Sequence, residues 1–277
     1  MNNITLTGIP RSGTTLTCHL LNKINNTVAL HEPIDVFEFS KLKEPKAICD
    51  SIEKFFLDTR QSILTEGKAI TKHHNQKVPD NPIASEKKGN ELRQSIAERG
   101  EIPIEKKLNS DFYLIIKHPA AFTALLPHLK KNFACFAVMR NPLSVLASWN
   151  SVNLPVNIGH APAAEALNTE LAHALSQRED CLDRQLFLLS WFYEQYATHL
   201  PQEAILRYEE TVSSQGKSLK KIVPEAQNLT ELLKSKNKNP LYDSEIMKKL
   251  ANRLLATPGA YWDFYSKESV ETLLQQY

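Results

Sequence analysis

The residues with the clearest chemical potential lie near the start of the chain, where residues 8–15 read GIPRSGTT. Two glycines with four residues between them give the G-x-x-x-x-G frame of a phosphate-binding loop, in which backbone amides at the start of a helix face an anion. A nucleotide kinase would carry a lysine after the second glycine, whereas this chain has Thr14 followed by Thr15. Arg11 can supply positive charge instead, because its planar guanidinium suits paired oxygens of phosphate or sulfate. The loop therefore predicts a phosphate- or sulfate-bearing ligand and disfavours an ordinary ATPase.

A second candidate anion site follows the apolar residues 134–139, which are predicted to form a strand. Arg140 comes directly after this strand, where a P-loop kinase often has an acid that organises Mg²⁺. A helix is expected from Leu143 to Val152, and Ser148 lies within it, eight residues after Arg140. Whether Ser148 approaches Arg140 depends on the turn between strand and helix. The strand-end arginine disfavours metal-assisted phosphoryl transfer.

These two segments resemble the donor-binding elements of sulfotransferases that use 3′-phosphoadenosine 5′-phosphosulfate (PAPS). Residues 10–16, PRSGTTL, resemble the loop that holds the 5′-phosphosulfate, and residues 140–149, RNPLSVLASW, resemble the element that binds the 3′-phosphate. The resemblance implies that Arg11 contacts the donor near the bond that breaks, and that Arg140 and Ser148 bind the 3′-phosphate. It also implies donor contacts from the rest of the loop, namely Ser12, Gly13, Thr14, Thr15 and Leu16. PAPS would be the donor and the 3′,5′-bisphosphate PAP its product, with no metal required.

Three residues qualify for sulfuryl transfer, which requires a base near the acceptor hydroxyl and positive charge near the sulfuryl group. Glu32 follows the first predicted helix, and Pro33 restricts its backbone. In glycan and tyrosyl-protein sulfotransferases, which share the PRSGTT variant, a glutamate in this region looks like the base. Lys117 resembles the lysine of a Lys-x-Pro turn that binds sulfuryl oxygens. His118 is the weaker candidate base, because small-molecule sulfotransferases place their histidine two residues after the lysine, whereas His118 follows Lys117 directly. Glu32 is preferred, and His118 stays open as the alternative.

The elements that must position these residues are short strands alternating with helices. Strands are predicted at residues 4–8, 113–117, 134–139 and 204–208, and a first helix at residues 14–23. Because each strand is short, mostly apolar and followed by a helix or turn, the pattern predicts the α/β class: a parallel β-sheet flanked by helices. The resemblance implies the P-loop nucleotide-binding architecture of sulfotransferases. We expect a single domain over residues 1–277.

Three further segments carry weaker signals. Residues 40–109 are interpreted as a helical or loop insertion over the sheet, and the charged run at residues 72–77 as a solvated loop, with contact to an anionic acceptor as the alternative. Apolar residues at helical spacing between residues 182 and 200 predict a helix packed on the core. Residues 260–265 lie where the family has a loop that closes over the donor, but they lack its basic glycine signature, so core packing is favoured.

Composition excludes several classes of protein. The chain has 277 residues, 42% hydrophobic and 23% charged, which is typical of a globular enzyme and disfavours a disordered scaffold. A formal net charge of +2 gives little support to a nucleic-acid binder, so any anion site must be local. The four cysteines form no CxxC pair, which disfavours a zinc site and a disulfide framework. With no signal peptide or membrane span expected, a cytoplasmic enzyme is predicted.

Two alternative functions remain open. A P-loop kinase of a small metabolite would need a loop lysine and a strand-end acid, and neither is present. A catalytically idle nucleotide-binding module would keep the donor pocket without turnover. Under the sulfotransferase hypothesis the partner is a small-molecule or glycan acceptor, with no nucleic acid and no membrane. The sequence does not identify the acceptor or the oligomeric state.

Overall fold

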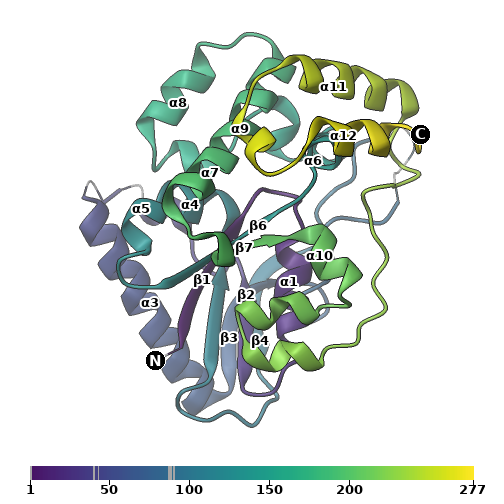
Figure 1. The fold of residues 1–277 in the computed structure, drawn as a ribbon. Coiled ribbons are helices and arrows are strands. Elements are labelled where there is room, and N and C mark those ends of the chain that lie inside the picture. Colours follow the sequence, from purple (N-terminus) through teal and green to yellow (C-terminus); the bar gives the residue numbers. More distant parts are fainter. Residues whose placement is uncertain (1, 40, 43, 87–88, 90) are drawn as a thin grey trace.

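A five-stranded sheet forms the centre of the computed structural model, which describes residues 2–39, 41–42, 44–86, 89 and 91–277. Neighbouring strands are parallel and follow the order β2-β5-β1-β6-β7. Their bounds are Thr27–His31 for β2, Tyr113–Lys117 for β5, Asn3–Gly8 for β1, Ala134–Met139 for β6 and Ile205–Arg207 for β7. The predicted α/β class, with a parallel sheet flanked by helices, is confirmed (Figure 1).

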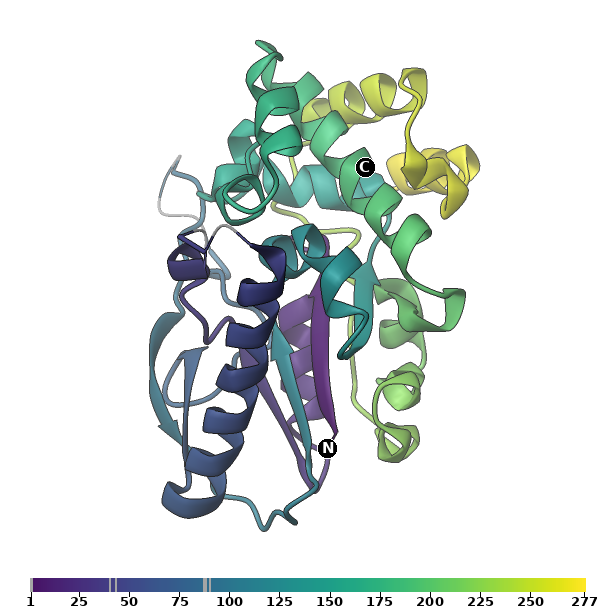
Figure 2. The ribbon, with the colours of Figure 1, turned by 90° about the vertical axis from the view of Figure 1, so that its left-hand side faces the viewer.

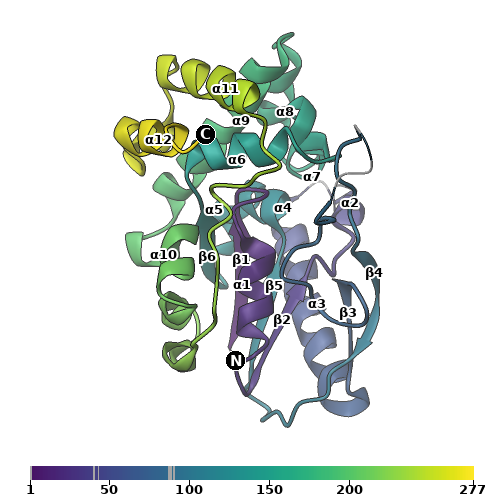
Figure 3. The same cartoon turned by 90° about the vertical axis from the view of Figure 1, so that its right-hand side faces the viewer.

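Helices cover both faces of this sheet because its strands are apolar on both sides. In β5, Ile115 packs in the hydrophobic cluster that includes α1 (Thr14–Leu21), whereas its neighbour Ile116 packs in the cluster on the opposite face. That second cluster includes residues of α3 (Pro45–Glu66) and α9 (Cys181–His199). Figure 2 shows α3 in front of the sheet, and Figure 3, from the other side, shows α1 in front. The predicted core role of the helix at residues 182–200 is thus confirmed.

The segment expected to be a helical or loop insertion also contains a small sheet. After α2 (Val36–Phe39) and α3, strands β3 (Lys68–His73) and β4 (Glu98–Pro103) pair antiparallel. This hairpin is joined to β2, because the hydroxyl of Thr71 accepts a hydrogen bond from the backbone N–H of His31 at 2.8 Å. Residues 68–73 and 98–103 were therefore wrongly predicted as helix or loop, and β2 was not predicted as a strand.

The remaining helices surround the upper end of the sheet in Figure 1 or follow β7 down its side. They are α4 (Pro119–Ala124), α5 (Leu126–Leu129), α6 (Pro142–Trp149), α7 (Pro162–Glu165), α8 (Thr169–Ser176), α10 (Tyr208–Ser213), α11 (Ser244–Ala256) and α12 (Lys267–Leu274). Short 3-10 helices lie at η1 (Pro155–Ile158), η2 (Gln202–Ala204), η3 (Lys217–Lys221), η4 (Pro224–Asn228) and η5 (Ala260–Asp263). Within the described ranges, no helix combines the length and apolar character needed to cross a membrane.

The residues at the start of α6 fix where this helix begins. The side chain of Asn141 accepts hydrogen bonds from the backbone N–H groups of Leu143, at 3.1 Å, and Ser144, at 3.4 Å, which caps the helix. Pro142 occupies the first helical position, where its missing N–H costs nothing. The helix therefore starts at Pro142, directly after Arg140 and the cap, and ends at Trp149 rather than Val152.

Candidate functional site

A cavity of about 870 Å³ lies at the carboxyl ends of the parallel strands, and every strand of the central sheet leads to it. Glu32 follows β2, Lys117 ends β5, the loop at residues 9–13 follows β1, Arg140 follows β6 and Tyr208 follows β7. Ligands of open α/β sheets commonly bind at this edge, near the point where the strand order reverses. The volume lies in the range of pockets for small molecules and cofactors.

The loop after β1 has the backbone that its glycines predict. Gly13 has a φ of 98°, and a Cβ there would lie 2.7 Å from Cδ2 of Tyr208, so only glycine fits without displacement. Gly13 caps α1 without any side-chain hydrogen bond, which leaves the first amides of the helix without a capping side chain. Thr14, Thr15 and Leu16 line the cavity beside those amides. This helix start can bind an anion.

Ser12 differs from its neighbours in the loop. Its hydroxyl donates a 2.7 Å hydrogen bond to the carbonyl of Val138, and its backbone N–H donates to the carbonyl of Ile9 at 2.9 Å. The side chain is fully buried and does not line the cavity. Ser12 therefore anchors the loop to β6, and the structure does not bring its hydroxyl to the cavity where donor contact was predicted.

Arg11 lines the cavity and has a left-handed backbone with a φ of 73°. Its Nε donates to the Ser148 hydroxyl at 3.2 Å, and its Nη2 donates to Oδ1 of Asn81 at 3.0 Å. Burial, together with the neighbouring positive charges of Arg93 and Arg140, lowers the pKa of Arg11 to about 10. These contacts bring the two predicted anion sites together, because Ser148 of the second motif holds Arg11 of the first.

Arg140 is a buried cation with an unused donor. Its Nη1 donates to the backbone carbonyl of Arg11 at 3.1 Å, its Nε donates to Oδ1 of Asn237 at 2.7 Å, and its guanidinium lies 4.6 Å from the ring centre of Tyr208. Nη2 is buried and has no hydrogen-bond partner among the described residues. An uncompensated buried charge is costly, so the arrangement suits an anion that enters the cavity. Ser148 lines the same cavity, so the entry turn of α6 does bring it to the site of Arg140.

Glu32 and Lys117 form the other end of the site. The Lys117 ammonium donates to the Glu32 carboxylate at 2.8 Å, and Lys72 binds the other oxygen at 2.6 Å. Burial alone would raise the pKa of Glu32, but Lys117, His31 and Lys72 together lower it well below its ordinary value. Burial lowers the pKa of Lys117 in spite of its partner. Glu32 is 24% exposed, so a carboxylate that stays ionised faces the cavity beside an almost fully buried ammonium.

The backbone holds Glu32 in an uncommon conformation. Its φ is 48°, in the left-handed region, although Pro33 favours an extended preceding residue. The N–H of Glu32 donates to the carbonyl of Lys117 at 2.9 Å, which continues the pairing of β2 with β5. Lys117 in turn reaches the hydroxyl of Thr15 at 3.4 Å. The carboxylate, the ammonium and the phosphate loop are therefore contiguous.

His118 faces away from this site. Its Nε2 accepts a 3.1 Å hydrogen bond from the backbone N–H of Ile34, and the ring does not line the cavity. Burial and the nearby ammonium of Lys117 lower its pKa to about 3, despite the opposing effect of Glu32. His118 is thus a neutral imidazole whose lone pair is already used. The structure places the predicted alternative base outside the cavity, whereas Glu32 lies in its wall.

A lysine-bearing segment that was not predicted as part of the site also lines the cavity. Residues 232–242 run without regular structure between η4 and α11, and Lys234, Lys236 and Lys238 all line the cavity. Figure 3 shows this segment running beside α1 before it reaches α11. The backbone N–H of Lys236 donates to the hydroxyl of Tyr208 at 2.8 Å, which fixes the segment to the end of β7. The signal in the sequence is the alternation of lysines in KSKNKN, because alternate residues of an extended chain share one side.

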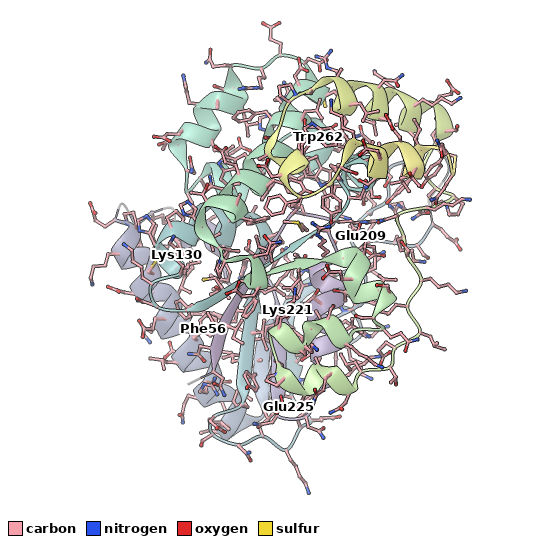
Figure 4. The ribbon with its side chains drawn as sticks, viewed as in Figure 1. Phe56, Lys130, Glu209, Lys221, Glu225 and Trp262 are labelled. Atoms are coloured by element: carbon pink, nitrogen blue, oxygen red, sulfur yellow. The ribbon has the colours of Figure 1, made fainter. Side chains whose placement is uncertain are left out.

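Glu209 ties this segment to the second motif. Its Oε1 accepts from the backbone N–H of Asn141, at 2.9 Å, and from Nδ2 of Asn237, at 2.8 Å, while its Oε2 accepts from the hydroxyl of Tyr265 at 2.8 Å. Figure 4 labels Glu209 at the start of α10. These contacts hold the turn after β6 and the lysine-bearing segment in one arrangement.

Residues 260–265 do not close over the cavity. Tyr261 is fully buried, with its ring centre 6.2 Å from that of Tyr193 and 4.9 Å from that of Trp262, which Figure 4 labels in the C-terminal layer. None of these residues lines the cavity. Core packing, the favoured interpretation, is confirmed. Of the charged run at residues 72–77, Lys72 belongs to β3 and contacts Glu32.

Comparison with known proteins does not identify the chain. A scan against protein-family models found no matching family, and a search of curated proteins found no similar sequence. The geometry of the cavity therefore carries the functional argument.

Proposed function

We propose that the protein is a sulfotransferase that transfers a sulfuryl group from PAPS to a hydroxyl or amine of a small-molecule or glycan acceptor. The observation that carries the proposal is one cavity that is lined by the start of α1 and Arg11, by Arg140 and Ser148, and by the Glu32–Lys117 pair. Phosphate at both ends of a nucleotide would match the two anion sites. A cytoplasmic location belongs to the same proposal.

The proposed donor fits the order of charges along the strand ends. The 5′-phosphosulfate would lie against the amides of α1, with Arg11 beside the bridging oxygen, and the 3′-phosphate would lie beside the guanidinium of Arg140 and the Ser148 hydroxyl. The lysines at 234, 236 and 238 add positive charge around it. PAPS carries several negative charges, and among the described residues that line the cavity only Glu32 and Asp80 oppose them.

The proposed reaction is a displacement at sulfur. The acceptor oxygen forms a bond to sulfur as the bond between sulfur and the bridging oxygen breaks, and the electron pair of that bond leaves with PAP. Glu32, held ionised by its lysine partners, accepts the proton of the acceptor hydroxyl. Arg11 stabilises the charge that develops on the leaving phosphate, and Lys117 the charge on the sulfuryl oxygens; one such preorganised donor contributes about 10²–10³ in rate.

Calorimetry with PAP, AMP and ATP tests the donor site directly. We expect PAP to bind more tightly than AMP or ATP, because those two nucleotides lack the 3′-phosphate that Arg140 and Ser148 would bind. Formation of PAP from PAPS in the presence of acceptor pools then tests turnover. Equal affinity for AMP and PAP, or phosphorylation that depends on ATP and Mg²⁺, would defeat the proposal in favour of a kinase. Selective PAP binding with no turnover on any acceptor pool would favour an idle binding module.

A further inference from the structure

A third arginine, Arg93, lines the cavity and is buried without a counter-ion among the described residues. Arg93 belongs to the segment between β3 and β4 and is 4% exposed. In the described part of the chain, no carboxylate oxygen of Asp or Glu lies within 4.0 Å of it. Burying a guanidinium without an anion carries an energetic penalty that the rest of the fold must offset. A positive charge kept in this position points to an anionic ligand.

Neutral groups hold the guanidinium of Arg93 in place. Its Nη2 donates to the hydroxyl of Ser151 at 2.8 Å, and its Nε donates to the Ser151 carbonyl at 3.4 Å. The backbone is fixed as well, because Arg93 N–H donates to the Ser151 carbonyl at 3.3 Å and its own carbonyl accepts from Asn153 N–H at 2.9 Å. The side chain is therefore positioned before any ligand binds, and its charge remains uncompensated.

Ser151, which binds the guanidinium of Arg93, lies just after Trp149, the last residue of the second motif. The Ser151 hydroxyl donates to the carbonyl of Ser148 at 2.9 Å, and Ser148 is the residue that accepts from Arg11. Arg93 and Arg140 both act on Arg11 as repelling charges. Three arginines, Arg11 and Arg140 from the motifs and Arg93 from outside them, thus line the same cavity as Ser148. A phosphate dianion would accept charge-assisted hydrogen bonds from them and relieve their mutual repulsion.

We propose that Arg93, which lies shortly before β4, is a third binding residue for the 3′-phosphate of the nucleotide. This inference rests on the proposed function. A nucleotide is favoured over an anionic acceptor as the ligand of Arg93, because Arg93 is bonded to Ser151, just after α6. An acceptor would instead react beside the Glu32–Lys117 pair, at the ends of β2 and β5.

Calorimetric titration of PAP and of AMP into the full chain tests the inference. Arg93→Gln is expected to lower PAP affinity by about tenfold or more while AMP affinity stays within about twofold, because only PAP carries the group that Arg93 binds. Arg93→Lys keeps the charge but not the planar fork, and should give an intermediate ratio of PAP to AMP affinity. Arg99→Gln is the matched control, because Arg99 is an arginine of the adjoining strand β4 that bonds the Pro33 carbonyl and does not line the cavity. The Arg99→Gln protein should keep the wild-type ratio of PAP to AMP affinity.

Two results would overturn the inference. One is an unchanged ratio of PAP to AMP affinity in Arg93→Gln, whether both affinities stay the same or fall equally; the other, should the glutamine variant not fold, is an unchanged ratio in Arg93→Lys. A wild-type protein that binds PAP no better than AMP would instead defeat the proposed function. The two failures are therefore distinguishable, because one appears in the wild type and the other only in the variants.

Discussion

The ammonium of Lys117 donates a 2.8 Å hydrogen bond to the carboxylate of Glu32, and this contact joins the end of β5 to the end of β2. Lys117 is 3% exposed at its side chain, so its charge depends on Glu32 for compensation. A second lysine, Lys72, comes from the neighbouring hairpin. Substitution of Glu32 therefore tests two things: the chemistry proposed for the cavity, and the contribution of this ion pair to the stability of the fold.

Glu32→Gln should abolish most sulfuryl transfer while PAP binding is retained. The amide preserves size but cannot accept the proton, a step that contributes about 10²–10⁴ in rate. PAP formation should be measured at saturating PAPS, with PAP affinity determined separately by calorimetry. His118→Asn is the comparison and should have the smaller effect, because His118 lies outside the cavity. If the asparagine variant were the one that lost turnover, the base would be His118.

The same substitution should reveal a pH-dependent contribution to stability. Because the pKa of Glu32 in the fold lies well below its ordinary value of 4.5, the ion pair contributes stability that is fully present above about pH 5 and is lost as the pH falls through the lowered pKa. The free energy of unfolding of wild type and Glu32→Gln should be measured by urea titration between pH 3 and pH 7. We expect the free energy of unfolding of the wild type to exceed that of Glu32→Gln by a constant amount above about pH 5, and this difference to decrease below it. A difference that did not vary with pH would contradict this account.

Arg140→Ala should weaken PAP binding and leave AMP binding nearly unchanged. Hydrogen bonds to charged groups contribute about 1.5–3 kcal/mol, which corresponds to roughly 10- to 100-fold in affinity. Arg178→Ala is a suitable control, because Arg178 packs over the ring of Phe187 and does not line the cavity. Circular dichroism should show the same secondary structure in both variants. An Arg140→Ala protein with wild-type PAP affinity would remove this residue from the site.

Gly13→Ala should destabilise the protein more than Gly67→Ala. Both glycines have positive φ, which costs an alanine about 1–2 kcal/mol. Only at Gly13 does the added Cβ overlap a neighbour, Cδ2 of Tyr208 at 2.7 Å, whereas at Gly67 no atom lies within 4 Å. The overlap should add about 1–3 kcal/mol. Urea unfolding of the two variants measures the difference, and equal losses would show that the loop yields without strain.

Local signals predicted the strands and loops that carry the proposed phosphate sites. β5 and β6 were predicted with their observed bounds, because both are short apolar runs with a charged residue at the end. Strands β3 and β4 escaped prediction for a physical reason. Their sequences, KAITKH and ERGEIP, lack a regular apolar alternation, since they form a two-stranded sheet with many exposed residues. Pairing with a neighbour, rather than local preference, makes them strands.

The contacts between distant segments could not be predicted. Asn237 reaches Arg140 only because the chain returns from η4 toward α11. Arg93 reaches Ser151 only because the chain shortly before β4 lies beside the end of α6. No local pattern encodes these approaches. The sequence also left open whether Ser148 comes near Arg140, which depends on the cap at Asn141 that starts α6. Residue types therefore predicted the charges, and tertiary packing decided which of them meet.

The strand order sets a fixed distance between the two ends of the site. Three strand spacings separate β2, which carries Glu32, from β6, which carries Arg140, and at about 4.8 Å each they span about 14 Å. Side-chain substitutions cannot alter this span, because backbone hydrogen bonds between the strands maintain it. Under the proposed function, this span separates the reacting group of the acceptor, beside Glu32, from the 3′-phosphate of the donor, beside Arg140, and the sheet keeps the two apart.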